Sequence, residues 1–231
     1  MTRIVTVIIQ ARMGSTRLPG KVMMRIDGKP MLSHLLDRVL AANLIEKVIV
    51  ATSTENSDDI IQSYCESQGV KCYRGSEKDV LERYYSCALV GDVQNVMRIC
   101  ADSPLIDPNI IDQLIMRFRS KSGELDYLSN TINRTYPLGM NCEIFTFAAL
   151  AKAHFETKSL YDREHVTPYM YGNPQLFNLY EVHCENDLSS IRLTVDTVED
   201  FMRVAGIIRR IKGVDYSLAQ ILQTIDANKI D

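Results

Sequence analysis

Three cationic side chains follow the first apolar segment of the 231-residue chain within ten positions. The stretch QARMGSTRLPGK places Arg12, Arg17 and Lys21 directly after the β-branched run IVTVII. Gly14 and Ser15, between the cations, would let backbone N–H groups point into a concave loop. Arginine and lysine form charge-assisted hydrogen bonds with phosphate oxygens. The stretch therefore predicts a polyphosphate-binding loop; a solvated basic loop is the alternative.

Two aspartates follow apolar segments in the same way. Asp102 comes after VMRICA and before Ser-Pro, and Asp196 comes after IRLTV and before a predicted helix. Two carboxylates at strand ends could share Mg²⁺ with phosphate oxygens, because Mg²⁺ binds few protein carboxylates and retains substrate phosphates. Alternatively, Asp102 caps its own turn and Asp196 caps the helix that follows.

The apolar pattern predicts an α/β fold. Strands and helices alternate up to residue 120, which indicates βαβ units and a mainly parallel sheet flanked by helices. Ligands of such sheets bind beyond the carboxyl ends of the strands, where the basic loop and Asp102 would lie. The expected strands in this part are Ile4–Ile9, Lys47–Ala51, Val70–Tyr73 and Val96–Ala101. The expected helices are Met31–Ala42, Asp58–Gln68, Asp79–Leu89 and Pro108–Arg119.

After Gly123 the pattern changes to short segments separated by turns. We expect residues 1–231 to form one domain with a mixed sheet. Residues 125–185 would cover a cleft or build a subunit interface. The expected strands are Tyr127–Asn130, Cys142–Phe145, Leu176–His183 and Arg192–Val195, and the expected helices are Phe147–His154 and Glu199–Ile211.

Composition excludes several classes of protein. With 46% hydrophobic and 24% charged residues the chain is an ordinary globular sequence, and its net charge of −3 argues against a nucleic-acid partner. No apolar run is long enough for a membrane span, and the N-terminus does not resemble a signal peptide. Six scattered cysteines form neither a disulfide framework nor a zinc motif. We therefore expect a cytoplasmic protein with free thiols.

The basic loop is neither a Walker A motif, because Val22 follows Lys21, nor a GxGxxG motif. Instead, VIIQARMGSTRLPGKVMMRIDGKPML resembles the opening of the cytidylyltransferases that activate acidic sugars, as in CMP-Kdo and CMP-sialic acid synthesis. The branch named after spore coat polysaccharide biosynthesis protein F is the most similar. Further blocks of the family follow in order: VIVATS, YRGSEKDVLERYYSCA, RICADSPLIDP, NRTYPLGMNCEIF, DREHVTPYM and LTVDTVEDF.

This resemblance implies a nucleotide-diphospho-sugar transferase (Rossmann-like) fold. Residues 1–231 would then form a single nucleotidyltransferase domain, with residues 125–185 as an acceptor-binding or dimerisation insertion. It also implies the reaction of CTP with a sugar acid to give a CMP-sugar and pyrophosphate. By position, Arg12, Lys21, Asp102 and Asp196 would be catalytic, and both aspartates would bind Mg²⁺. The implied substrate-binding residues are Ala11, Gly14, Ser15, Arg17, Ala51, Thr52, Gly75, Ser76 and Asp79. Related enzymes are commonly dimers, so we expect a homodimer.

Two positions depart from the Kdo-activating enzymes. Cys100 stands where they carry a glutamine near the base, and GSEKDVLER does not match their sugar loop. Strict use of CTP is therefore the less secure implication, and the acceptor is expected to differ from Kdo. On the acceptor side we expect Tyr136, Gly139 and Glu143.

The roles of three residues stay open. Glu143 lies in a strand-like run, either at a sheet edge, which is the commoner reason for a charge there, or facing ligand. Arg83 could pair with a carboxylate or stabilise the turn at Asp79. His165 could act as a general base or as a structural hydrogen-bonding residue before Pro168, and we favour the structural role.

Two other classes of protein compete with the cytidylyltransferase. A metal-dependent glycosyltransferase of GT-A-like fold would use a nucleotide-sugar donor, but it usually carries a DxD-like motif, and only single strand-end acids are found. A non-catalytic nucleotide-binding protein would not need the paired aspartates.

Overall fold

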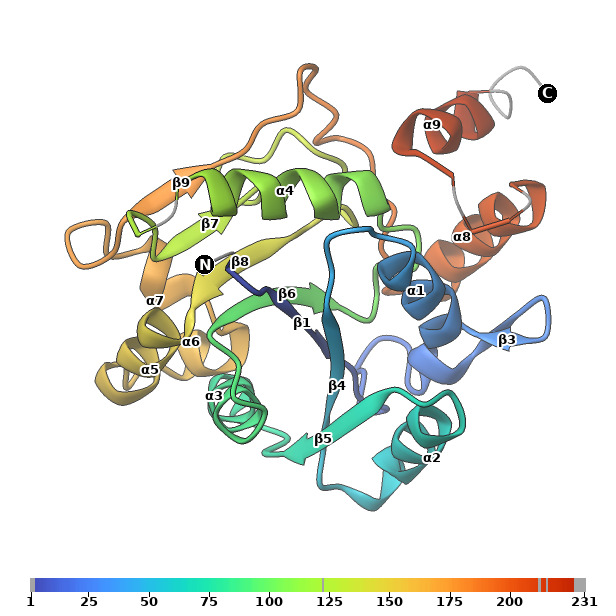
Figure 1. Cartoon of the computed structure of the whole chain (residues 1–231). Helices are drawn as coiled ribbons and strands as arrows, with labels where there is room; N and C mark the ends of the chain where they lie inside the picture. Colours follow the sequence, from blue (N-terminus) through green and yellow to red (C-terminus); the bar gives the residue numbers. More distant parts are fainter. Residues whose placement is uncertain (1–2, 122, 212, 215, 227–231) are drawn as a thin grey trace.

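The computed structural model describes residues 3–121, 123–211, 213–214 and 216–226. Within these ranges a seven-stranded sheet runs through the middle of the molecule in the order β5-β4-β1-β6-β8-β7-β9 (Figure 1). The strands are β1 (Thr6–Gln10), β4 (Lys47–Ser53), β5 (Lys71–Gly75), β6 (Asn95–Cys100), β7 (Tyr127–Ser129), β8 (Glu143–Thr146) and β9 (Leu179–Glu181). A small hairpin of β2 (Arg25–Ile26) and β3 (Lys29–Pro30) lies apart.

Strand direction divides the sheet into two parts. The strands β5, β4, β1 and β6 are parallel, with β1 paired to both β4 and β6. β8 runs antiparallel to its neighbours β6 and β7, whereas β7 and β9 are parallel. The mainly parallel mixed sheet predicted from the sequence is confirmed.

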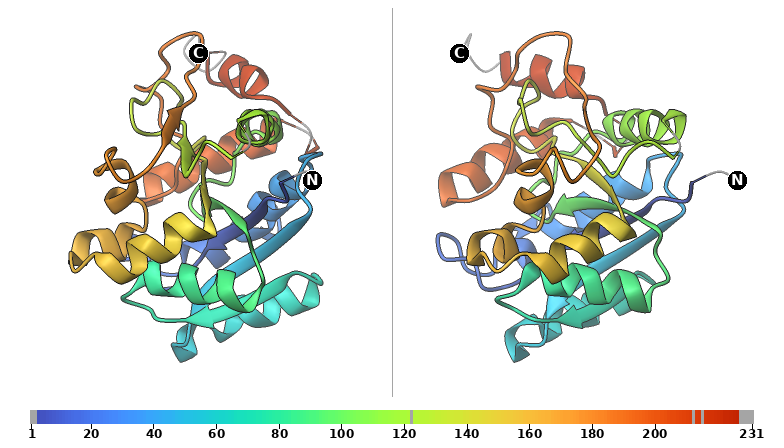
Figure 2. Two further views of the ribbon diagram at one scale, coloured as in Figure 1. Left: turned by 60° about the vertical axis from the view of Figure 1, so that its left-hand side comes forward. Right: turned by 90° about the vertical axis from the view of Figure 1, so that its left-hand side faces the viewer.

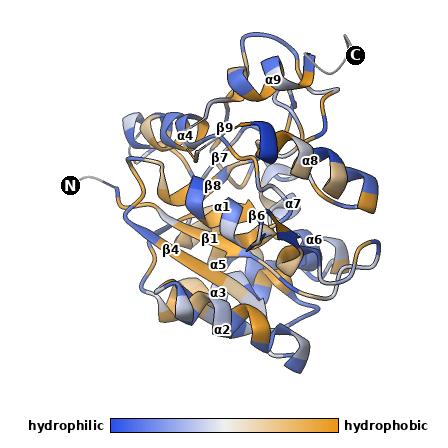
Figure 3. Ribbon diagram, turned by 90° about the vertical axis from the view of Figure 1, so that its right-hand side faces the viewer, coloured by the Kyte–Doolittle hydropathy of each residue, from blue (hydrophilic) through white to orange (hydrophobic). Residues whose placement is uncertain are grey.

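Helices cover both faces of this sheet (Figure 2). On one face, side chains from α1 (Met31–Leu40), α2 (Asp59–Ser67), α4 (Pro108–Ser120) and α8 (Val198–Arg210) share a core with Val7 and Ile9 of β1. On the other face, α3 (Val80–Val90) and α5 (Phe147–Glu156) pack around Ile8. Because both faces are covered, β1 and β4 are apolar along most of their length (Figure 3).

Short elements complete the described chain: the 3₁₀ turns η1 (Lys21–Met23) and η2 (Asn56–Asp58), and the helices α6 (Leu160–His165), α7 (Pro168–Tyr171) and α9 (Leu218–Asp226). No described helix has both the length and the apolar character that a membrane span requires. The described cysteines are all unpaired, as predicted.

Most predicted elements are present within a few residues of the expected bounds, with one clear error. The prediction of a strand over Arg192–Val195 is wrong, because this extended segment forms only an isolated parallel bridge between Leu138 and Arg192. Leu176–His183 contains only the short β9. The helices α6, α7 and α9 were not expected.

Gly139 lies where the chain passes closest to this extended segment. Leu138 N–H donates to Ile191 O at 2.9 Å, and Leu193 N–H donates to Leu138 O at 2.7 Å. Gly139 has a φ of +109°, and a Cβ at this position would stand 2.9 Å from the carbonyl carbon of Leu193. Glycine is therefore required here by backbone packing.

We expect Gly139→Ala to lower the free energy of unfolding by about 2 kcal/mol or more, because it adds both backbone strain and a steric clash. Urea denaturation would measure this change. The control is Gly206→Ala in α8, where nothing lies within 4 Å of the added Cβ. The free energy of unfolding of that variant should equal the wild-type value or exceed it by up to about 1 kcal/mol. Equal stability of the two variants would contradict the packing role.

Candidate functional site

The basic loop leaves the carboxyl end of β1 and is fixed by a neighbouring loop. Met13 N–H donates to Asp58 Oδ1 at 2.7 Å, and the other oxygen of this buried carboxylate accepts from Ser53 N–H at 3.1 Å. The loop closes on itself where Gly20 N–H donates to Met13 O at 2.9 Å. Gly20 adopts a φ of +73°, which a glycine adopts without strain. Hydrogen bonds therefore hold the backbone of the basic loop in one conformation.

A cavity of about 310 Å³ opens beside this loop. Arg12 and Ser15 line it, and in the described part of the chain the Arg12 guanidinium has neither a hydrogen bond nor an ion pair. An unpaired guanidinium over a cavity suits an anionic ligand. The predicted residues that the structure brings together here are Ala11, Arg12, Ser15, Arg17, Lys21, Asp102 and Asp196.

Asp102 and Asp196 converge on one ammonium group. The Nζ of the buried Lys21 lies 2.9 Å from Asp196 Oδ1 and 3.8 Å from Asp102 Oδ2. The same Nζ donates to Val195 O at 2.7 Å, and Val195 N–H donates to Asp102 O at 2.9 Å. The segment before Asp196 is thereby attached to the turn after β6, so two acids far apart in the sequence face one point.

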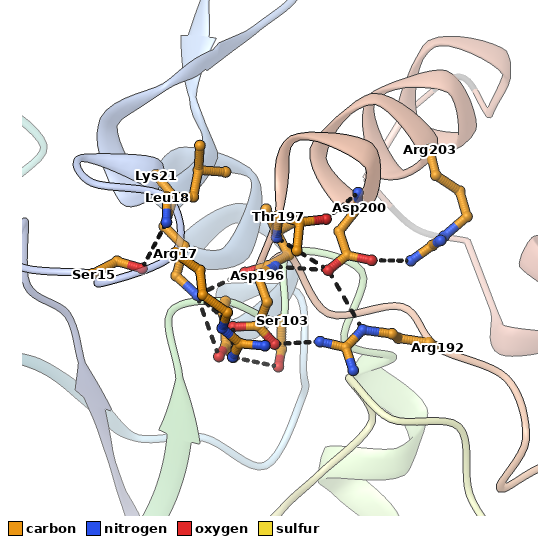
Figure 4. A network of polar contacts seen from close by, with 12 residues as sticks. Ser15, Arg17, Leu18, Lys21, Ser103, Arg192, Asp196, Thr197, Asp200 and Arg203 are labelled. Atoms are coloured by element: carbon orange, nitrogen blue, oxygen red, sulfur yellow. Dashed lines mark hydrogen bonds and ion pairs between the residues drawn. The ribbon is translucent and has the colours of Figure 1, made fainter.

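Asp196 is held by three cations (Figure 4). Besides Lys21, Arg17 Nη2 lies 2.9 Å from Oδ1, and Arg192 contacts Oδ2. The alternative that Asp196 caps the helix is wrong, because Thr197 is the N-cap of α8 and forms a capping box with Asp200. The Asp200 carboxylate also accepts from Asp196 N–H at 3.0 Å. Sequence reasoning missed Arg192, which lies four residues before Asp196 in an extended segment, so alternation places both side chains on the same side.

The two carboxylates fit a magnesium ion. Burial raises the pKa of Asp102, and the neighbouring charge of Asp196 raises it further, while Lys21 lowers it. A divalent cation shared by both groups would remove this repulsion. No cluster of three or more His, Cys, Asp or Glu side chains with metal-binding geometry occurs within the described ranges. Two carboxylates are nevertheless sufficient for Mg²⁺ that also binds phosphates.

A second cavity, of about 380 Å³, adjoins the first. Both are lined by Cys100, Asp102, His165 and Asp196. Burial raises the pKa of the Cys100 thiol to about 12, so this group is a neutral thiol near neutral pH and not a nucleophile. Ligands in the two cavities would therefore meet at Asp102 and Asp196.

Glu143 lies in the second cavity, and the edge-strand explanation is wrong. Its strand β8 is paired on both sides, with β6 and with β7. Its side chain is 5% exposed and forms an ion pair with Arg98. Single-sequence reasoning could not find this partner, because the contact depends on the order of the strands.

His165 enters both cavities from α6, directly before an unusual turn. Val166 has a φ of +72° and is fully buried, and Thr167 N–H donates to His165 O at 2.9 Å. A β-branched residue in this conformation is strained. The turn fixes the direction in which His165 and Thr167 leave the backbone.

Several predicted residues lie outside both cavity linings. Asp79 caps α3 by accepting from Glu82 N–H at 2.9 Å, and it also pairs with Arg163 Nε at 2.6 Å. Tyr136 is buried, with its hydroxyl 3.2 Å from Gln113 Oε1. The complete set outside the linings is Gly14, Ala51, Thr52, Gly75, Ser76, Asp79, Tyr136 and Gly139.

Arg83 supports the turn before α3. Its Nη1 donates to Ser76 O at 2.7 Å, which agrees with the turn-stabilising alternative. It is also buried at the wall of the first cavity, where its Nε lacks a hydrogen-bond partner.

Comparison with known proteins agrees with this geometry. The cytidylyltransferase family profile matches residues 6–221. Spore coat polysaccharide biosynthesis protein SpsF of Bacillus subtilis is 30% identical over 230 residues, covering 96% of this chain and 93% of that protein. A 3-deoxy-manno-octulosonate cytidylyltransferase of Geobacter metallireducens is 34% identical over 111 residues, covering 48% of this chain and 43% of that protein.

A solved structure is similar over the full length. The cytidylyltransferase from Leptospira borgpetersenii superimposes with a TM-score of 0.95 at 34% identity, covering 100% of this chain and 96% of that one. The family match includes the basic loop, Asp102 and Asp196, which are the residues that the fold brings together. This chain belongs to the cytidylyltransferase family.

Proposed function

We propose that the enzyme transfers the cytidylyl group of CTP to a sugar acid, giving a CMP-activated sugar acid and pyrophosphate. The observation that carries this proposal is the convergence of Asp102 and Asp196 on Lys21 beside a basic loop. The acceptor class is supported by SpsF and by the Geobacter enzyme, whose names refer to a polysaccharide and to an octulosonate. The product would serve the synthesis of a surface polysaccharide or glycan.

In this proposal the first cavity holds the nucleotide. Arg12 and Lys21 would bind the phosphates together with Ser15. Arg17 has a side chain that is 62% exposed, so it can turn from Asp196 to the triphosphate at little cost. Lys21 and Arg17, which pair with Asp196 in the free protein, would then neutralise the departing pyrophosphate.

Asp102 and Asp196 would hold Mg²⁺ against the α-phosphate. When bound, the ion would withdraw charge from the phosphate and acidify the attacking hydroxyl. The lysine ammonium, which lies within 4 Å of both carboxylates, supports this assignment, because one positive charge already lies between them.

The reaction is an in-line displacement. The sugar hydroxyl oxygen would bond to the α-phosphorus while the bond to the bridging oxygen of the β-phosphate breaks. Pyrophosphate leaves with that electron pair, and the hydroxyl proton passes to solvent. The protein's share is to position the reactants and to neutralise charge, and no covalent intermediate is needed.

The glycosyltransferase alternative is not favoured, because the chain matches the cytidylyltransferase family profile and the similar Leptospira structure is that of a cytidylyltransferase. A non-catalytic nucleotide-binding protein would not require two partly buried acids to face the same cavity.

The direct test is a panel of nucleoside triphosphates against an octulosonic and a nonulosonic acid, with pyrophosphate release as the measurement. We expect release only when CTP, Mg²⁺ and a sugar acid are present together. Release that does not depend on the acid, or activity with a nucleotide-sugar donor instead, would contradict the proposal.

We expect Asp102→Asn to reduce turnover on the order of 100-fold or more, because a neutral amide holds a divalent cation poorly. Pyrophosphate release across a Mg²⁺ titration would measure this, with circular dichroism to check the fold. Asp92→Asn is the matched control, since Asp92 is exposed beyond the opposite end of β6. Unchanged Mg²⁺-dependent turnover in the Asp102 variant would refute its role.

We also propose that the enzyme is a homodimer and that residues 125–185 serve the acceptor, the dimer or both. Eleven of these residues line the second cavity, which supports the acceptor role. Three apolar side chains of α5 and α6 are exposed: Phe155 by 63%, Leu160 by 85% and Tyr161 by 60%. Exposed apolar clusters commonly mark protein interfaces.

Sedimentation equilibrium should give twice the protomer mass. Leu160→Glu should shift the protein towards the monomer, because a carboxylate would be buried in the interface. Leu40→Glu on α1, which is also exposed, should leave the mass unchanged. A monomeric wild-type protein at micromolar concentration would contradict the dimer.

A further inference from the structure

Three extended segments form the floor of the second cavity, and every second side chain of each segment faces the cavity. Side chains of an extended segment point alternately to opposite sides. The residues between the cavity-facing side chains, Ile99, Cys142 and Val195, are buried in the core. The cavity-facing side chains are Arg98 and Cys100 on β6, Asn141 and Glu143 at the start of β8, and Thr194 and Asp196 before α8.

The charged pair in this floor is internally satisfied. Glu143 Oε1 accepts from Tyr127 Oη and from Thr167 Oγ1, both at 2.6 Å. Glu143 Oε2 accepts from Arg98 Nη1, and Arg98 Nε donates to Gln10 Oε1 at 3.2 Å. The two charges cancel, so this pair itself adds no net charge to the cavity.

Two polar atoms of the cavity lining have no partner. Thr194 is 5% exposed, and its Oγ1 is buried without a hydrogen bond. Asn141 Oδ1 is likewise buried and unpaired. A buried polar atom without a partner costs about 1–3 kcal/mol, and such atoms are uncommon in folded proteins. Both residues line the same cavity, which points to hydrogen-bonding groups supplied by a ligand.

The cavity also has an uncompensated positive charge. Arg134 lines it, is exposed, and forms neither a hydrogen bond nor an ion pair with any described residue. Asp196 in the same lining is already paired with Lys21, Arg17 and Arg192, whereas the Arg134 guanidinium is left for an anionic ligand.

We propose that the second cavity binds the acceptor through Thr194 and Asn141. Thr194 Oγ1 and Asn141 Oδ1 accept hydrogen bonds from hydroxyl or amide groups of a polyhydroxylated acid. Arg134 forms an ion pair with the carboxylate of that acid. This assignment rests on the proposed cytidylyl transfer and adds the residues that select the acceptor. Because Asp102 and Asp196 line both cavities, the acceptor lies directly beside the nucleotide.

The test compares Thr194→Val, which removes only the hydroxyl function, with Thr194→Ser, which keeps it. The probes are 3-deoxy-manno-octulosonic acid and N-acetylneuraminic acid, with CTP and Mg²⁺, and the readout is pyrophosphate release. We expect Thr194→Val to raise the KM for the acid by about 3- to 10-fold, because this is the loss of affinity that removal of one hydrogen bond causes. The KM for CTP should stay within about twofold, and Thr194→Ser should stay near wild type.

The matched control is Thr6→Val, because Thr6 is equally buried but lies at the opposite end of β1. An unchanged KM for the acid in Thr194→Val would overturn the assignment while leaving the cytidylyl transfer intact. An equal rise in both KM values would also overturn it, since it would place Thr194 on the nucleotide side. If wild type releases no pyrophosphate with either acid, the proposed function fails and this inference fails with it.

Discussion

The site depends on one electrostatic constraint: two carboxylates from distant parts of the chain face the same buried ammonium. Without Lys21 between them, Asp102 and Asp196 would repel each other in a partly buried setting. The ammonium, together with Arg17 and Arg192, makes this arrangement stable in the free protein. Two of these cations, Lys21 and Arg17, also line the first cavity, so under the proposed function the charges that stabilise the free site would bind the triphosphate.

The sheet explains why these charges meet. In its parallel part, β1 and β6 are neighbours, and both end at the same edge. The basic loop leaves one strand and Asp102 follows the other. Asp196 reaches this edge through the extended segment that bonds to Leu138 and to Asp102. The antiparallel β8 extends the sheet beside β6 and adds the floor of the second cavity.

Much of this was predictable from the sequence, for definite reasons. Buried parallel strands are continuous apolar runs, so the strands up to β6 and the basic loop after β1 could be located. The segment Arg192–Val195 alternates polar and apolar residues as a strand does, yet it is not a strand, because its backbone bonds are to Leu138 and to the turn at Asp102. The partners of Glu143 and Asp79 depend on which elements become neighbours, and one sequence does not contain that information. Arg98 could have been found from alternation alone, since it lies two residues before Cys100.

The anchor between Asp58 and the basic loop has a consequence for dynamics. One carboxylate accepts backbone N–H groups from Met13 after β1 and Ser53 at the end of β4, so Asp58 ties the basic loop to the end of β4. Under the proposed function, nucleotide binding beside this anchored loop would involve rotation of long side chains such as Arg17 rather than rearrangement of the backbone. Side-chain rotation takes picoseconds to nanoseconds, whereas loop motion extends to microseconds. The cleft is therefore preorganised in its main chain and adaptable only in its cationic tips.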